Sequence, residues 1–228
     1  MVDDPAGHLA RVRSAPRVFS GRGGPHWSGE RRRVCLVREG YTRRVRRLRL
    51  IENITADRRL EMIDDWFSPS PDKEVSDLQA EMERQGESCD AMVLGRQTFE
   101  DFRGYWPQHT DEPAGAYLDQ VQKYVVSATM TDPAWQRTTV LSGDPVGEVR
   151  RLKGSDGRDL MMTGSIMLAH AVLAAGLVDE IRLFVYPAIQ GRGKGLVPEG
   201  TALPHLELRE AKSFRSGVVL LGYTVLGG

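Results

Sequence analysis

Short apolar runs recur along the chain from residue 48 onward, and each run is typical of a β-strand. The run Leu48–Ile54 shows partial alternation of apolar and polar residues, which indicates a strand. Ala91–Leu94 is apolar at every position, as in a strand that is covered on both faces. On this pattern we expect strands over residues 48–54, 91–94, 123–127, 138–141, 159–163, 178–186, 206–209 and 218–225.

Apolar residues at helical spacing, together with capping residues, predict helices between these strands. In the first helix, Asp72 or Ser70 is expected to cap the start, and Gly86 is expected to mark the end. In the last helix, Ser165 is expected to cap the start and Gly176 the end. The predicted helices span residues 72–84, 98–105, 145–152 and 165–175.

The order of these elements predicts one α/β domain with a mixed, mostly parallel sheet flanked by helices. Strands that alternate with helices favour parallel pairing through right-handed crossovers. The C-terminal end lacks helices, and a turn over residues 213–217 joins its last two strands. We therefore expect antiparallel strands at that end of the sheet.

The first 46 residues have a different composition from the rest of the chain. The whole chain carries 31 basic and 31 acidic residues, yet residues 1–47 hold 12 arginines and only 4 acidic residues. A stretch rich in Arg, Gly, Pro and Ser buries too little apolar surface to offset the entropy cost of ordering it. We expect residues 1–46 to be a basic, disordered extension and residues 47–228 to be the folded domain.

The arginines of the extension raise the alternative of a nucleic-acid-binding arm. They cluster at residues 31–33 and 43–47. Clustered arginines match phosphate backbones, but no aromatic stacking pattern or known fold accompanies them here. The composition therefore favours a disordered tail, or coding sequence read upstream of the true start, over a nucleic-acid partner.

Cysteine and histidine usage argues against a metal site or a disulfide framework. The two cysteines, Cys35 and Cys89, form no CxxC pair, and the five histidines show no ligand spacing. No apolar run reaches the roughly 18 residues that a membrane span needs. The N-terminus also lacks the apolar core of a secretory signal. We expect a cytoplasmic protein with no membrane partner.

Small and polar residues follow several of the predicted strands where the chain leaves the sheet. Gly95, Arg96 and Thr98 follow one strand at the start of a helix, and Ser127 ends another. Ligands of open α/β sheets bind beyond the carboxyl ends of the strands. A glycine, an arginine and a helix start together suit a phosphate group.

A third strand end, Thr163–Ile166, repeats this arrangement of strand, glycine and helix start. Taken alone, each of the three strand ends has an ordinary explanation as a turn. Together they predict a groove lined with anion donors at one edge of the sheet. None of them forms a GxGxxG or Walker loop, so neither a standard Rossmann site nor a P-loop is supported.

In their order along the chain, several motifs resemble one known family. These segments are Leu94–Glu100, Val126–Thr129, Thr163–Ser165, Gly176–Ile181 and Tyr186–Gly193. They resemble the dihydrofolate-reductase-like proteins, and specifically the branch similar to the C-terminal reductase domain of bacterial riboflavin biosynthesis. The resemblance covers about residues 47–227. It implies a dihydrofolate-reductase-like fold and an NADPH-dependent oxidoreductase.

The implied reaction is hydride transfer to a small heterocyclic or sugar-derived substrate, similar to that of 5-amino-6-(5-phosphoribosylamino)uracil reductase. The resemblance also implies cofactor-binding residues, namely Gly95, Arg96, Thr98, Ser127, Thr163, Gly164, Ser165 and Ile166. The deaminase domain that often accompanies this reductase is absent from the chain, which weakens assignment to the riboflavin pathway.

The loop after the first strand supplies the catalytic and substrate-binding candidates that the resemblance implies. Asp57 matches an acid that is common in the family and is the candidate proton donor, although Asp64 and Asp65 lie in the same loop. Trp66 and Phe67 match an aromatic pair near the substrate. A hydrophobic anchor that closes the loop is an equal alternative for the pair.

Two departures from the family pattern keep a second function open. Thr163 stands where the family has the first of two glycines, and Asp57 is followed by Arg58 where the nearest branch has glycine. These changes favour the alternative of a non-catalytic small-molecule-binding protein on the same fold. The apolar C-terminal strands are a candidate homodimer interface. Asp179 and Glu180 are expected to form caps or salt bridges instead of a catalytic pair.

Overall fold

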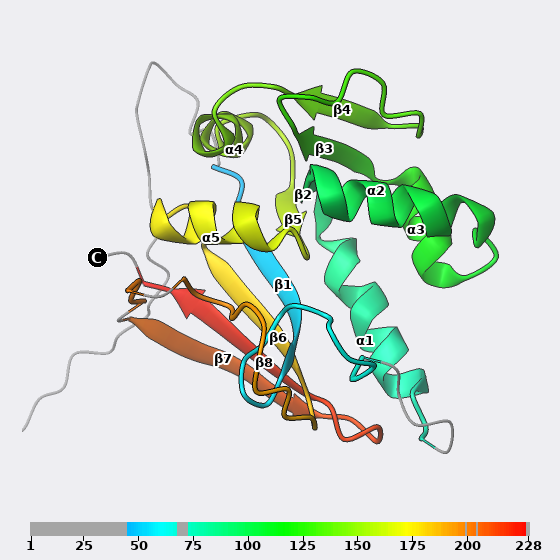
Figure 1. Ribbon diagram of the computed structural model, residues 1–228, viewed down its shortest axis with the longest axis vertical. Coiled ribbons are helices and arrows are strands. Elements are labelled where there is room, and N and C mark those ends of the chain that lie inside the picture. The colour runs from blue at the N-terminus through cyan, green and yellow to red at the C-terminus, as the bar shows by residue number, and fades with distance from the viewer. Residues whose placement is uncertain (1–44, 68–72, 199, 204, 227–228) are drawn as a thin grey trace, which may run out of the picture. The chain divides into compact units, whose positions relative to one another are not determined.

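A single sheet carries every strand of the described residues, which are 45–67, 73–198, 200–203 and 205–226 of a computed structural model (Figure 1). The strands are β1 Leu48–Thr55, β2 Cys89–Gly95, β3 Gln122–Val126, β4 Thr138–Leu141, β5 Asp159–Met162, β6 Glu180–Tyr186, β7 Leu206–Ser213 and β8 Val219–Val225. Their order across the sheet is β4-β3-β2-β5-β1-β6-β8-β7. The first six run parallel, and β8 pairs antiparallel with β6 and β7. The predicted fold class is confirmed.

Helices cover both faces of the sheet. They are α1 Ser76–Glu87, α2 Arg96–Tyr105, α3 Pro113–Gln120, α4 Pro145–Lys153 and α5 Ile166–Ala174, with a short 3-10 turn, η1, at Trp106–Gln108. Figure 1 shows α4 and α5 on one side of the sheet and α1, α2 and α3 on the other. No helix in the described part of the chain is long and apolar enough to cross a membrane.

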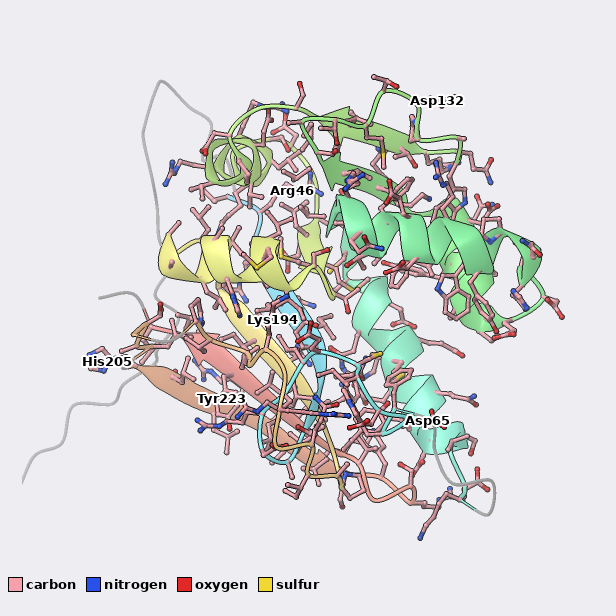
Figure 2. All side chains as sticks on the ribbon, viewed as in Figure 1. Arg46, Asp65, Asp132, Lys194, His205 and Tyr223 are labelled. Carbon is pink, nitrogen blue, oxygen red and sulfur yellow. The ribbon has the colours of Figure 1, made fainter. Side chains whose placement is uncertain are left out.

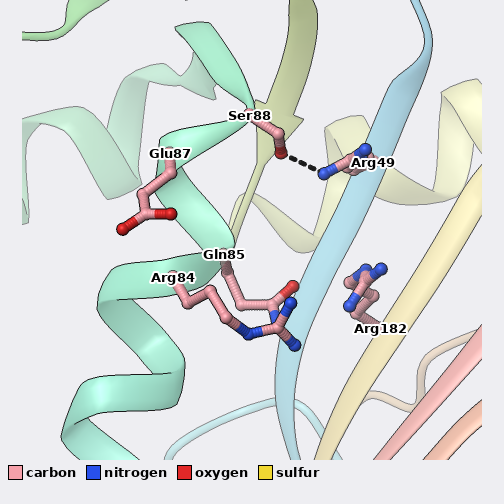
Figure 3. A pocket seen from close by; sticks show the side chains of 6 residues that line it. All are labelled: Arg49, Arg84, Gln85, Glu87, Ser88 and Arg182. Atoms are coloured by element: carbon pink, nitrogen blue, oxygen red, sulfur yellow. Dashed lines mark hydrogen bonds between the residues drawn. The ribbon is translucent and has the colours of Figure 1, made fainter.

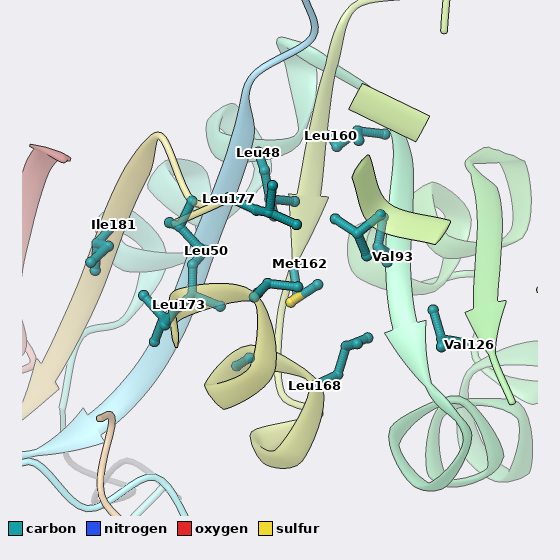
Figure 4. Close-up of a cluster of buried hydrophobic side chains, with 14 of the residues drawn as sticks. Leu48, Leu50, Val93, Val126, Leu160, Met162, Leu168, Leu173, Leu177 and Ile181 are labelled. Atoms are coloured by element: carbon teal, nitrogen blue, oxygen red, sulfur yellow. The ribbon is translucent and has the colours of Figure 1, made fainter. Parts of the chain in front are cut away.

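Two hydrophobic cores form because successive side chains of a strand point to opposite faces. Leu50 and Ile54 of β1 pack in the core on the α4–α5 side, together with Leu168 of α5 (Figure 4). Ile51 packs in the second core, which includes Phe99 of α2. The carboxyl end of β1 therefore lies between both cores, and its side chains face either one helix layer or the other.

The first helix starts later and ends later than the sequence pattern predicts. It begins at Ser76, whose N–H bonds to Glu74 Oε1 at 3.0 Å. The expected caps, residues 70 and 72, lie outside the described residues. Gly86 does not end the helix. It lies buried inside it, where an added Cβ would come within 2.9 Å of the Tyr117 ring of α3. The glycine therefore allows two helices to pack closely.

Helix α3 was not predicted, because few of its side chains carry the apolar signal. Only Gly115 and Leu118 are buried in it, so no helical period can be read from the sequence. Helix α2 was predicted from Thr98 but begins two residues earlier, at Arg96.

The folded part of the chain reaches further toward the N-terminus than expected. Arg46 is buried, donates from Nε to Arg158 O at 2.6 Å and forms an ion pair with Asp90 (Figure 2). The composition places Arg46 in the basic extension, and the structure corrects this boundary. Residues 1–44 lie outside the described residues, so the disordered extension stays a prediction.

The acidic pair at the start of β6 has the predicted structural role. Asp179 Oδ2 accepts a hydrogen bond from Leu48 N at 2.8 Å and forms an ion pair with Lys153. Glu180 pairs with Arg47 at 2.9 Å and with Arg49 at 3.1 Å. These contacts tie the amino ends of β1 and β6 together.

Candidate functional site

Five residues, one from strand β1 and four from the β2–α2 and β5–α5 connections, meet toward the carboxyl ends of β1, β2 and β5. Gly95 N donates to Ser165 Oγ at 2.7 Å, and Ser165 N donates to Thr98 Oγ1 at 2.8 Å. Gly164 N donates to Glu52 Oε2 at 3.0 Å. We call Glu52, Gly95, Thr98, Gly164 and Ser165 the strand-end junction. It brings together four of the predicted cofactor-binding residues.

The bend in the junction requires an unusual backbone. Gly164 and Ser165 have φ values of 58° and 56°, so two successive residues are left-handed. A Cβ on Gly164 would lie 2.9 Å from Thr98 Cγ2. The left-handed conformation costs a non-glycine residue about 1–2 kcal/mol, and the two hydrogen bonds of Ser165 offset this cost. Thr163 is not among the left-handed residues, so its Cβ introduces no such strain.

Two helices begin at the junction without a side-chain cap. Helix α2 follows Gly95, which has no side chain, and helix α5 follows Ser165, whose side chain makes no capping hydrogen bond. The predicted capping role of Ser165 is wrong, because its hydroxyl accepts from Gly95 instead. Uncapped first turns leave N–H groups and the positive ends of two helix dipoles open to an anion.

Three predicted cofactor residues lie beside the junction. Arg96 lies in the first turn of α2, and its side chain is 54% exposed. Its guanidinium group is 3.6 Å from the Glu100 carboxylate, and an exposed ion pair of this kind is weak. Ile166 opens α5 and packs against the core. Ser127 follows Val126, which pairs with Gly95 in the sheet. Its hydroxyl accepts from Met130 N at 3.1 Å and so closes the turn after β3.

Asp57 ties two loops together. Its carboxylate accepts from Thr55 Oγ1 at 2.5 Å, Gln190 N at 3.1 Å and Gly191 N at 2.8 Å. The Thr55 hydrogen bond is the main cause that lowers the pKa of Asp57 to about 2, with the two backbone N–H groups adding to it. A carboxylate that stays ionised at neutral pH does not supply a proton. Of the other acids in this loop, Asp64 pairs with Arg192 at 2.5 Å.

The predicted substrate-binding pair belongs to an aromatic cluster. Trp66 and Phe67 lie with their ring centroids 5.4 and 5.3 Å from that of Tyr186. This contact anchors the loop to the end of β6. Burial raises the pKa of the Tyr186 hydroxyl. Trp66 Nε1 and Asn53 Oδ1 are buried without a hydrogen-bond partner among the described residues. The unpartnered donor and acceptor keep the substrate-binding alternative open.

Glu52 is the junction residue that the sequence analysis missed. It is 3% exposed, and its Oε1 has no hydrogen-bond partner among the described residues. Burial raises its pKa well above the ordinary value, and the Gly164 N–H offsets only part of this effect. The available signal was an acid between Ile51 and Ile54 in a mostly apolar strand.

A cavity of about 360 Å³, shown in Figure 3, has lining residues near the amino ends of β1, β2 and β6, whereas the junction lies toward the carboxyl ends. It is lined by Arg49, Arg84, Gln85, Glu87, Ser88 and Arg182. Ion pairs with Glu180, Glu81 and Glu210 already engage its three guanidinium groups. The cavity therefore offers little uncompensated positive charge to a ligand. The described residues also contain no cluster of His, Cys, Asp and Glu that could hold a metal ion.

Comparison with known proteins identifies relatives of this chain. The family model of the RibD C-terminal domain matches residues 54–220. The uncharacterized protein YyaP of Bacillus subtilis is 28% identical over 163 residues, which cover 70% of this chain and 82% of that protein.

Solved structures share the fold at low sequence identity. A putative riboflavin biosynthesis protein from Shewanella sp. PV-4 superposes with a TM-score of 0.60 at 19% identity, covering 78% of this chain and 98% of that one. A pyrimidine reductase-like protein from Corynebacterium diphtheriae gives 0.53 at 13% identity, covering 80% and 93%. The deaminase/5-amino-6-(5-phosphoribosylamino)uracil reductase of Thermotoga maritima gives 0.57 at 13% identity. The match covers 79% of this chain but only 57% of that bifunctional protein.

Proposed function

This chain belongs to the RibD C-terminal domain family, and we propose that it is an NADPH-dependent reductase. Its substrate would be a small heterocyclic or sugar-derived molecule with a carbonyl or imine carbon. The reaction would resemble that of 5-amino-6-(5-phosphoribosylamino)uracil reductase. When bound, the cofactor supplies the hydride, and the protein supplies binding, orientation and a path for the proton.

The observation that carries this proposal is the strand-end junction with its two uncapped helices. The N–H groups of Gly95, Gly164 and Ser165 already have partners within the protein. These residues therefore shape the bend, while the first turns of α2 and α5 provide the donors for the cofactor phosphates. A Cβ at residue 164 would lie 2.9 Å from Thr98 Cγ2, so the glycine there lets the two strand ends pack closely and brings both helix starts to one place.

The family resemblance suggests the individual roles. Arg96, with Thr98 beside it, would hold the adenosine 2′-phosphate and the pyrophosphate, and Ser127 would lie near the 2′-phosphate. Ile166, at the start of α5, would contact the nicotinamide ribose. Thr163 would complete the same strand end. Trp66 and Phe67, as part of the aromatic cluster, would border the substrate.

Asp57 has a different role in this proposal from the one that the resemblance implies. Because its pKa is lowered to about 2, it is ionised at neutral pH and holds the loops after β1 and β6 together. We assign it a positioning role at the substrate side and leave proton delivery to water or to another carboxyl group.

The proposal is tested by titrating the purified protein with NADPH, with NADH in parallel, followed by fluorescence. We expect micromolar NADPH binding and weaker NADH binding. Arg96→Ala should weaken NADPH binding by roughly tenfold or more, because it removes a charge-assisted contact worth about 1.5–3 kcal/mol.

Arg151→Ala is the matched control for this titration. Arg151 is a helical arginine that is 63% exposed and paired with Glu148 within its own helix. It lies near the end of α4, where Lys153 O accepts from Arg46 N just before β1 and away from the carboxyl ends of the strands, so its removal should leave NADPH affinity unchanged. Absence of NADPH binding at millimolar concentration would reject the reductase function.

A non-catalytic small-molecule-binding protein remains the second candidate. It is favoured by Arg58, which stands in place of the glycine of the nearest branch and has a φ of 65°. This candidate would be favoured if the protein binds NADPH but does not oxidise it in the presence of any small heterocyclic compound with a carbonyl or imine carbon.

A further inference from the structure

Glu52 is a buried acid at the junction, and no described cation pairs with it. It lies in β1 opposite Leu183 of β6, and on the same strand face as Leu50 and Ile54. Its one hydrogen bond in the described structure is the 3.0 Å bond from Gly164 N to Oε2. An ionised carboxylate in such a place carries a large desolvation cost.

The titratable groups on the surrounding elements are engaged elsewhere or face away from this core. In α5, His170 Nε2 contacts Gly195 O at 2.9 Å. In α4, Lys153 pairs with Asp179, Arg151 pairs with Glu148, and Arg150 is exposed. On the neighbouring strands, Asp159, Glu180 and Arg182 take part in the ion pairs on the α1 side. In the loops above, Asp57, Arg192 and Lys194 bond to loop residues.

The geometry also indicates which oxygen carries the proton. Oε2 accepts the Gly164 N–H, so a neutral acid holds its proton on Oε1, the oxygen without a partner. Burial raises the pKa of Glu52 well above its ordinary value, which agrees with a neutral side chain.

We propose that Glu52 is a positioning residue that holds the Gly164–Ser165 bend as a neutral acid and makes anion binding at the junction dependent on pH. The hold on the bend rests on the structure alone. The identity of the anion, the phosphates of NADPH, rests on the proposed function.

Two physical effects connect the proton on Glu52 to the bend. An ionised carboxylate recovers hydration only by admitting water or by moving away from Gly164, and either change loosens the bend. It also places a negative charge one hydrogen bond away from the helix start that would bind phosphate, and like charges repel.

Stability should change with pH in a defined direction. The pKa of Glu52 is higher in the folded protein than in the unfolded chain, so the folded state binds more protons between the two values. The free energy of unfolding should therefore fall as pH rises from the ordinary pKa of a glutamic acid toward the raised one. Glu52→Gln should remove this part of the slope.

The first test uses the ligand-free full chain and three variants. Amide exchange at Gly164, measured at one pH by NMR, should be about tenfold faster in Glu52→Leu, because the variant loses one hydrogen bond. Glu52→Gln, whose amide oxygen still accepts, should exchange within about twofold of the wild type. Glu81→Gln is the control, because Glu81 is equally buried but bonds to Arg84, Gln85 and Lys212. After correction for any change in the free energy of global unfolding, its amide exchange rate at Gly164 should equal that of the wild type.

The second test is NADPH affinity between pH 6 and pH 9. Wild-type affinity should fall by up to about tenfold per pH unit above the pKa of Glu52, and Glu52→Gln should bind with a flat profile. Unchanged exchange in Glu52→Leu, or a wild-type pH slope in Glu52→Gln, overturns the proposal. If Glu52→Leu does not fold, the pH dependence of stability and of NADPH affinity in Glu52→Gln tests the proposal instead. If no variant binds NADPH but Gly164 responds as expected, the proposed function fails and the positioning role stands.

Discussion

At the scale of single residues, two non-glycine residues near the site hold a left-handed backbone, and one of them, Arg58, is a departure from the family pattern. Arg58 has a φ of 65° at a position where the nearest branch has glycine. Ser165 has a φ of 56° directly after Gly164. At Ser165 the strain is offset by hydrogen bonds to Gly95 and Thr98, whereas the hydrogen bonds of Arg58 in the described structure are main-chain bonds that a glycine would also make, to Thr55 O and from Leu196 N. Thr163, the other departure, is not left-handed, so its Cβ carries no such strain.

Arg58→Gly should stabilise the protein. A left-handed backbone costs a non-glycine residue about 1–2 kcal/mol, and the substitution removes this cost. Part of the gain is lost because glycine has more conformational entropy in the unfolded chain, so the net increase in the free energy of unfolding is about 0.5–1 kcal/mol. The measurement is urea unfolding of both proteins. Arg58→Ala, which keeps a Cβ at the same φ, should give no gain. Equal stabilisation by both substitutions would mean that the backbone conformation is not the cause.

Close packing between elements decides where the first helix ends and how it meets its neighbour. A glycine near the end of a helical pattern predicts a C-terminal cap. Gly86 is instead buried within α1, and the ring of Tyr117 from α3 occupies the space of its missing side chain. The sequence does not indicate this contact, because α3 has only two buried residues and its sequence therefore shows no helical periodicity of apolar residues.

Gly86→Ala should destabilise the protein by about 1–3 kcal/mol, the usual cost of overpacking, despite a helix-propensity gain of up to about 1 kcal/mol. Gly104→Ala in α2 is the matched control, because no atom lies within 4 Å of its added Cβ. The control should show the propensity gain alone. Thermal and urea unfolding of both variants measure the difference. A stabilised Gly86→Ala protein would show that the Tyr117 ring moves without cost.

At the scale of the whole molecule, the sheet has one covered part and one open edge. Helices pack on β1 to β6, and the antiparallel pair β8 and β7 ends the sheet. Nearly all residues of β7 are exposed, including Leu206 and the 55% exposed Leu208. An exposed edge strand with apolar side chains is typical of a surface that pairs with another chain.

We therefore expect a homodimer that forms through β7. Sedimentation should give the mass of a dimer for the wild type and a shift toward the monomer for Leu208→Lys, because a buried lysine would oppose association. Met62→Lys is the control, since Met62 is similarly exposed at 57% but lies in the loop after β1. A monomer mass for the wild type would reject the dimer.

Local sequence patterns determine much of this protein by themselves. Alternation and apolar runs depend on near neighbours along the chain, so they predict each strand of the described residues, the mostly parallel pairing and the antiparallel C-terminal end. They also placed Gly95, Thr98, Gly164 and Ser165 at the same edge of the sheet. The tertiary structure alone decided which of these residues bond to one another and which acid would be neutral. Glu52 and Gly164 are 112 residues apart, and the raised pKa of Glu52 comes from burial by several elements at once. No short stretch of sequence contains that information.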